Sequence, residues 1–139
     1  MIQAGIVQQI ELASTMESLS EMESFIDGMC DQNKFGEDHY GNILIALTEA
    51  VNNAINHGNK LNPEKKVYLN METMVGGVQF TIKDQGSGFD YTNIPDPTLP
   101  ENLEKLNGRG VFLMRSLADI VAFEGNGAIV KLKFSISSS

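Results

Sequence analysis

The sequence has 139 residues, of which 42% are hydrophobic and 20% are charged, and its 18 acidic and 10 basic residues give a formal charge of −8. This length fits one domain, residues 1–139, which can bury a core without disulfides or metals. The acidic balance excludes a protein whose main ligand is a nucleic-acid backbone, because such proteins need a basic face. The single cysteine excludes a disulfide within the chain, and no apolar run approaches the ~20 residues of a membrane helix. We therefore expect a small cytoplasmic protein with no nucleic-acid partner and no membrane partner.

The first half of the chain predicts a strand followed by two helices. Residues 5–13 predict the strand, and Ser14 and Glu17 then have the spacing of a capping box, which marks the start of a helix. That helix carries apolar side chains along one stripe, namely Met16, Leu19, Met22, Ile26, Met29 and Cys30. A second helix is expected over residues 38–57, where Gly58 ends it.

The second half predicts four strands, a long loop and one short helix. Residues 67–71 and 78–84 alternate between apolar and polar side chains on either side of Gly76-Gly77, which predicts a hairpin. Residues 85–107 contain three of the four prolines and predict a long loop. A helix at 110–118, strands at 120–123 and 128–134, and a frayed tail at 137–139 follow. This order predicts an α/β two-layer sandwich, a mixed, mostly antiparallel sheet with about three helices on one face.

Polar side chains on the second predicted helix form the first candidate site. At 100° per residue, Glu49, Asn53, Asn56 and His57 lie opposite the apolar side, and Glu49 and Asn53 are one turn apart. They can be an ordinary solvated helix face, although asparagine is a poor helix former and is unusually frequent here. A carboxylate and a carboxamide one turn apart can also serve as a base and as an oxygen ligand of Mg²⁺, which takes few protein ligands.

The second candidate site follows the strand at residues 78–84. Asp84 continues the apolar series of that strand by one further step of two, which directs its carboxylate to the covered side of the sheet. A buried carboxylate needs a hydrogen-bond donor, and the exocyclic amine of adenine is a suitable one. Gly86 and Gly88 would let a flat ligand approach the backbone closely. The alternative is a strand that ends in an Asp/Gly turn and binds nothing.

The third candidate site is the start of the third predicted helix. Gly108 and Gly110 expose backbone N–H groups there, and the helix dipole favours an anion such as phosphate. Arg109 between them can contact a phosphate directly. The alternative is a plain junction between a loop and a helix. A Walker A loop is excluded because no Gly-Lys-Ser/Thr follows, and Leu113 in the sixth position excludes a full dinucleotide fingerprint.

In this order, the three segments resemble the conserved boxes of the histidine-kinase-like (GHKL) ATPases, which include gyrase, Hsp90 and sensor kinases. Residues 49–58 (Glu-Ala-Val-Asn-Asn-Ala-Ile-Asn-His-Gly) are similar to the N box of that family. Residues 84–90 resemble its first glycine box, and residues 108–115 its second. The pattern of the first segment is most similar to bacterial anti-sigma factors that are also serine protein kinases. The resemblance covers residues 40–134.

The resemblance implies a role for each residue. Asn53 would hold Mg²⁺ against the nucleotide phosphates, Glu49 would orient or deprotonate the attacking hydroxyl, and Asp84 would bind the adenine amine. Residues 91–107 would form a lid over the nucleotide. The residues implied to contact ATP or ADP are Asn53, His57, Asp84, Gly86, Gly88, Lys105, Gly108, Arg109 and Gly110. Relatives carry a threonine near the end of the chain that supports adenine recognition, and this sequence has Ile129 there.

The function that this resemblance implies is that of an ATP-binding anti-sigma factor with protein-serine kinase activity. It would phosphorylate a serine of an anti-anti-sigma partner and alternately sequester a sigma factor. The alternative is a nucleotide-binding interaction module of the same fold that transfers no phosphoryl group, and Glu49 favours the enzyme because a module needs no base. A third reading is a small domain that binds no nucleotide. Exposed apolar surface on the first helix could support a homodimer.

Overall fold

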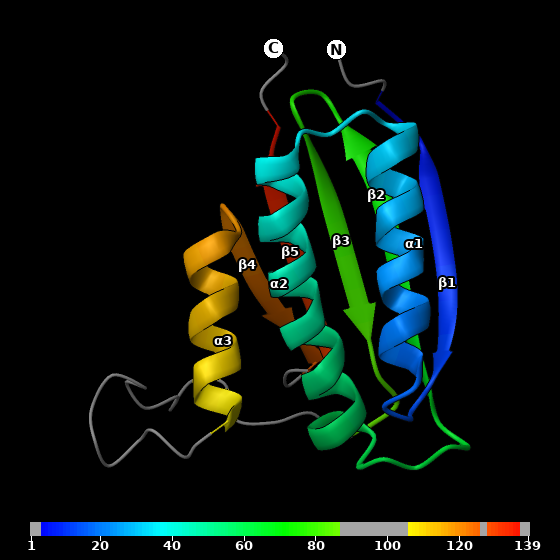
Figure 1. The fold of residues 1–139 in the computed structure, drawn as a ribbon. Helices are drawn as coiled ribbons and strands as arrows, with labels where there is room; N and C mark the ends of the chain where they lie inside the picture. The colour runs from blue at the N-terminus through cyan, green and yellow to red at the C-terminus, as the bar shows by residue number, and fades with distance from the viewer. Residues whose placement is uncertain (1–3, 87–105, 126–127, 137–139) are drawn as a thin grey trace.

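The computed structural model describes residues 4–86, 106–125 and 128–136, and for residues 106–109 it describes the backbone alone. Its elements are β1 (Val7–Ala13), α1 (Ser18–Gln32), α2 (Glu37–Asn53), the π-helical turn η1 (Ala54–Gly58), β2 (Lys66–Met74), β3 (Gly77–Lys83), α3 (Leu106–Leu117), β4 (Ile120–Glu124) and β5 (Ile129–Ser135). Within these residues, five strands form one sheet in the order β1-β2-β3-β5-β4, with all neighbours antiparallel. The three α-helices lie together on one face of the sheet (Figure 1). The predicted two-layer α/β sandwich is confirmed, except that the described sheet is antiparallel throughout rather than mixed.

The β2–β3 hairpin shows how the sequence pattern sets the two faces of the sheet. Every second residue of β2 from Val67 to Thr73 is buried, which is the period expected of a strand with one covered face. Met74 pairs with Gly77, so the connecting turn consists of Val75 and Gly76. The turn therefore lies one residue earlier than the sequence predicted.

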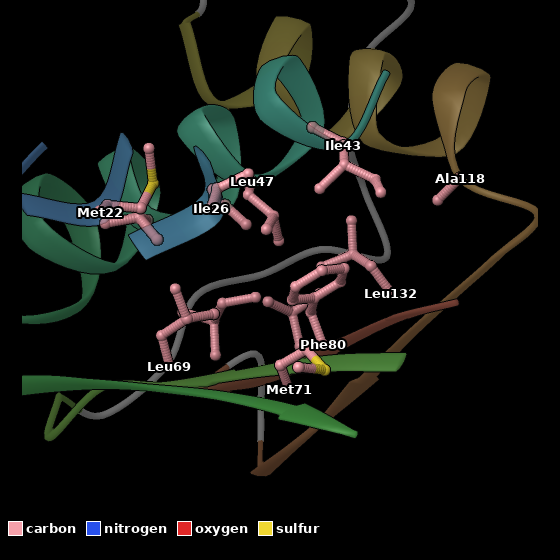
Figure 2. Packing of buried hydrophobic residues seen from close by; sticks show 14 of the residues in the cluster. Met22, Ile26, Ile43, Leu47, Leu69, Met71, Phe80, Ala118 and Leu132 are labelled. Carbon is pink, nitrogen blue, oxygen red and sulfur yellow. The ribbon is translucent and has the colours of Figure 1, made fainter. Parts of the chain in front are cut away.

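The hydrophobic core lies between the helices and the sheet. Ile26 of α1 and Ile43 and Leu47 of α2 point toward the sheet, as Figure 2 shows, and Met22 of α1 is buried as well. From the sheet, the side chains of Leu69, Met71, Phe80 and Leu132 point back toward them. Burying one such side chain fully stabilises the fold by roughly 1.5–3 kcal/mol.

The predicted capping box at the start of α1 is wrong. The helix begins at Ser18, and Glu17 occupies the N-cap with a helical backbone and no side-chain cap bond. Ser14 is instead fully buried at the end of β1, where its hydroxyl donates to the backbone carbonyl of Lys65 at 2.7 Å. The Ser14 side chain, which the local spacing assigned to the helix cap, thus bonds instead to a residue distant along the chain.

The outer surface of α1 is polar. Its exposed side chains are Ser20, Glu21, Glu23, Ser24, Asp27, Asp31 and Gln32. Leu19 and Phe25, the remaining apolar residues of the helix, pack partly buried against the core. Of the apolar residues expected on the first helix, Met16 is 48% exposed but precedes α1, and Leu19 is only partly exposed. The homodimer stays a prediction. Among the residues described, no helix is both long and apolar enough to cross a membrane.

Candidate functional site

Glu49 and Asn53 lie on the side of α2 that faces α3, which runs alongside α2 in Figure 1. Asn53 is the last residue of α2 and is only 6% exposed, while Glu49, one turn earlier, is half-buried. The alternative of a solvated helix face is thus excluded for Asn53. The sequence pattern could not show this, because the cover comes from a helix distant along the chain.

Gly110 of α3 brings the third predicted segment onto this pair. A Cβ atom on Gly110 would lie 3.1 Å from the Asn53 Nδ2 atom and 3.1 Å from the Glu49 Oε2 atom. A larger residue at this position would therefore press on both side chains. The helix also begins at Leu106, earlier than predicted, so Gly110 lies inside it and Gly108 lies in its first turn. The N–H groups of a first turn have no partner within the helix.

The carboxamide of Asn53 is incompletely bonded. Its Nδ2 atom is buried and has no hydrogen-bond partner among the described residues. Leaving a buried donor unpaired costs about 1–3 kcal/mol, so such groups in native proteins usually have a specific explanation. A ligand that reaches this position can complete the bonding of the amide.

Asp84 lies at the end of β3, and its carboxylate is on the covered side of the sheet, as its place in the strand predicted. The residue is 6% exposed, and its Oδ1 atom accepts a hydrogen bond of 2.8 Å from the Gly86 N–H group. Burial raises the pKa of this carboxyl above its ordinary value of 3.8, against the opposing effects of the Gly86 N–H bond and the Lys65 charge.

Two glycines allow the chain to close tightly around this carboxylate. A Cβ atom on Gly58, the last residue of η1, would lie 2.3 Å from the Asp84 Oδ2 atom. A Cβ atom on Gly86 would lie 1.8 Å from the Gly58 carbonyl oxygen, which is backbone and cannot swing aside. The end of the N-box segment and the first glycine of the next segment therefore interlock, and neither position has space for a side chain.

A single pocket connects the first two candidate sites. It is lined by Ala50, Asn53, Ala54, Ile82, Asp84, Met114, Phe123, Ala128 and Val130. Its volume is about 10 Å³, which is room for about one water molecule. Asn53 and Asp84 therefore share a pocket whose chemistry suits a ligand with an amine and polar oxygens, and the pocket must widen to admit anything as large as a purine.

The structure corrects the position expected to stand where relatives have threonine. Ile129 pairs with the exposed Lys83, so its side chain points to the open face of the sheet. The residues of this segment that line the pocket are Ala128 and Val130. The interpretation of Ile129 as the residue beside the base is therefore wrong, because the register of β5 turns it away.

The structure describes only some of the remaining predicted site residues. His57 lies in η1, is half-buried and does not line the pocket. Gly88, Lys105 and most of the segment 91–107 lie outside the described residues, and Arg109 is described by its backbone alone. The sequence reasoning missed Asn59, which directly follows Gly58 and is 1% exposed. The only sequence feature that could have indicated a role for Asn59 is its position directly after the glycine of the N-box segment.

Comparisons with known proteins agree with this geometry. The family model described as the histidine kinase-like ATPase domain matches residues 12–134. The chain is 28% identical over 132 residues to the serine-protein kinase RsbW of Staphylococcus epidermidis, covering 89% of this chain and 83% of that protein. It is 31% identical over 140 residues to the anti-sigma F factor of Bacillus subtilis, covering 93% and 94%.

A solved structure has the same fold. The structure of the RsbU and RsbW domains of a Mycobacterium tuberculosis protein aligns with a TM-score of 0.69 at 14% sequence identity. The alignment covers 96% of this chain and 33% of that one. At this identity the likeness shows the fold alone.

Proposed function

The chain belongs to the histidine kinase-like ATPase family, and we propose that it is an ATP-binding anti-sigma factor with serine kinase activity. In this proposal it phosphorylates a serine of an anti-anti-sigma protein, sequesters a sigma factor and so regulates transcription in the cytoplasm. The observation that carries the proposal is the shared pocket of Asn53 and Asp84, with Gly110 packed over Asn53 and Glu49.

Asp84 and the two glycines around it form what we call the base end of the site. The Asp84 carboxylate accepts one hydrogen bond from Gly86 and has further acceptor capacity directed at the pocket. An exocyclic amine can supply a further donor to this buried carboxylate. Gly58 and Gly86, packed against it, hold the carboxylate in place. These features favour adenine over a base that presents a carbonyl at that position.

Glu49, Asn53 and Gly110 form what we call the phosphate end. The unpaired Asn53 amide and its oxygen fit a metal-bound phosphate group, since amide oxygens are among the hard ligands that Mg²⁺ accepts. Bound Mg²⁺ would neutralise charge on the nucleotide phosphates. Glu49 is half-buried beside Asn53, and in this proposal its carboxylate orients the serine hydroxyl and takes its proton.

The partners are proposed from the relatives. One relative is named a serine-protein kinase and another an anti-sigma factor, and both align over most of their length. The acidic outer surface of α1 suits a basic partner surface, because complementary charge promotes encounter. Self-association stays a prediction, which sedimentation of the purified protein would test.

Thermal unfolding with and without Mg-ADP tests the nucleotide site. Ligand at about 100 times its dissociation constant adds roughly 2.7 kcal/mol of stability. For a chain of this size, we expect a rise in Tm on the order of 5–15 °C. The rise should need Mg²⁺ and disappear in Asn53→Ala. The ligand-free stability of this variant should not fall by much, because removal of the unpaired buried donor offsets the lost packing. No rise in the wild type at millimolar ADP would contradict nucleotide binding.

Phosphoryl transfer then separates the kinase from the alternative module. Labelled ATP is incubated with the protein and a candidate serine-bearing partner, and label on the partner is measured. Transfer that is absent although nucleotide is bound would reject the kinase and favour a module whose nucleotide only stabilises a partner-binding surface.

A further inference from the structure

Asn59 is a buried asparagine that connects three distant segments of the chain next to the base end. Its Oδ1 atom accepts a hydrogen bond of 2.7 Å from the Gln85 N–H group. Its Nδ2 atom donates to the Ser14 hydroxyl at 2.8 Å and to the Lys66 carbonyl at 3.0 Å. The side chain therefore uses its acceptor and its donors at once, in a position where only 1% of the residue is exposed.

The backbone around Asn59 adopts uncommon conformations. The preceding turn η1 is π-helical, and the Asn59 N–H group closes it on the Ala54 carbonyl at 2.8 Å. Lys60 and Leu61 follow with φ angles of 53° and 58°, a left-handed region that non-glycine residues rarely occupy. π-helical turns and left-handed residues of this kind occur often at functional sites. The surrounding bonds hold the Asn59 side chain at one place.

Gln85, which directly follows Asp84, is held by the hydrogen bond that its N–H group donates to Asn59. The Asp84 N–H group donates to the carbonyl of Ala128, the residue before β5, at 2.9 Å, so the backbone is tied to Ala128 on one side and to Asn59 on the other. The carboxylate itself is bonded to Gly86, two residues further along this turn. The Gln85 side chain is held as well, because its Oε1 atom accepts a hydrogen bond of 2.5 Å from the Lys66 N–H group. Loss of the Asn59 bond frees the Gln85 backbone, and we expect the turn at residues 84–86 then to shift and take the carboxylate with it.

We propose that Asn59 is a positioning residue that sets the adenine selectivity of the site by holding the turn at residues 84–86. This inference rests on the proposed nucleotide binding. Asn59 does not line the pocket and acts through Asp84. Without the Asn59 bond, the carboxylate no longer stands at one fixed position for the amine, and the site binds bases with and without that amine almost equally.

The test measures the affinities of Mg-ADP and Mg-IDP by calorimetry, because IDP carries a carbonyl where ADP carries the amine. A hydrogen bond to a charged group is worth enough to give the wild type a preference for ADP of about tenfold or more. In Asn59→Ala, ADP affinity should fall about tenfold while IDP affinity changes little, so that the preference nearly vanishes. In the nucleotide-free protein, exchange of the Gln85 amide hydrogen should become faster.

Ser14→Ala is the matched control. It removes the bond from Asn59 Nδ2 and the bond to the Lys65 carbonyl, but it leaves the bond from Asn59 to Gln85 in place. It should lower Tm and keep the preference for ADP. If Asn59→Ala does not fold at 25 °C, Asn59→Ser replaces it, because its shorter side chain leaves its oxygen out of reach of the Gln85 N–H group.

The outcomes separate the two proposals. The positioning role is supported if the Asn59 variant loses the preference for ADP over IDP while Ser14→Ala keeps it. A folded Asn59 variant that keeps the preference overturns the role while nucleotide binding stands. Loss of preference in both variants also overturns it, since general loosening then suffices. A wild type that binds neither nucleotide overturns the proposed function and this inference together.

Discussion

At the base end of the site the chain bonds its own polar groups, whereas at the phosphate end it leaves one without a partner. The Asp84 carboxylate accepts a hydrogen bond from the Gly86 N–H group. The N–H group of the next residue, Gln85, donates a hydrogen bond to the Asn59 side chain. At the phosphate end, the buried Nδ2 atom of Asn53 has no partner within the part of the chain that the structure describes. Both ends open on one pocket. The base end is thus preorganised without a ligand, whereas at the phosphate end a ligand is needed to satisfy the buried amide.

The physical difference lies in which atoms make the contacts. At the base end Gly58 packs against the Asp84 side chain, but Gly86 packs against the Gly58 carbonyl, a contact of backbone with backbone that cannot relax by rotation of a side chain. At the phosphate end the close approaches of Gly110 are to the tips of the Asn53 and Glu49 side chains. A preorganised base end lowers the entropy cost of recognising adenine, while movable side-chain tips can adapt to phosphates.

The largest effect is expected at the phosphate end, from Glu49→Gln. Removing a general base typically lowers the rate about 10²–10⁴-fold. The amide keeps the shape of the side chain, so Mg-ADP should still raise Tm as in the wild type. Labelled-phosphate transfer measures the rate, and Glu72→Gln, exposed on the open face of the sheet, is the control. Unchanged transfer would remove Glu49 from the proposed chemistry.

The next effect is expected at the base end, from Gly86→Ala. The added Cβ atom would meet the Gly58 carbonyl oxygen at 1.8 Å, so the interlocked turns must separate. Overpacking of this kind costs about 1–3 kcal/mol, which lowers Tm by roughly 3–10 °C. Thermal unfolding of the ligand-free protein measures it.

A glycine with free space provides the control for this change. Gly41 lies in α2 with nothing within 4 Å of an added Cβ atom, and Gly41→Ala should stabilise the helix by about 0.5–1 kcal/mol. If Gly86→Ala proves as stable as Gly41→Ala, the base end is not rigid and the contrast between the two ends fails.

A smaller effect on stability, with opposite sign, is expected from Asp84→Asn. Because burial places the folded-state pKa of Asp84 above 3.8, its contribution to stability is largest below pH 3.8 and is lost as pH rises through the folded pKa. The asparagine variant should therefore have a higher Tm than the wild type at pH 7, and the difference should shrink as the pH falls toward 3.8. Its affinity for Mg-ADP should drop.

Unfolding of both proteins across this pH range measures the effect. A difference in Tm that does not depend on pH would show that ionisation of Asp84 is not the cause. A variant less stable than the wild type at pH 7 would show that the carboxylate is compensated at the base end without a ligand.

The sequence pattern predicted the five strands, the three α-helices and the side of the sheet that Asp84 faces, but not the π-helical turn η1. Alternation with a period of two is local, so it identified the β2–β3 hairpin and carried Asp84 to the covered face. The apolar stripe of α1 and the three segments that resemble the family's boxes could also be identified, since each pattern depends only on neighbours in the chain. Element ends were less well determined, as the later start of α1 and the earlier start of α3 show.

The surroundings of these residues depend on contacts between segments that are distant along the chain. Asn53 is buried because α3 packs onto α2, and Asn59 gains its role from bonds to Ser14, Lys66 and Gln85. The faces of Ala128 and Ile129 depend on the register of β5, in which a shift of one residue exchanges the covered side for the open one. Contacts between distant segments are set by packing of the whole chain, and no local pattern records them.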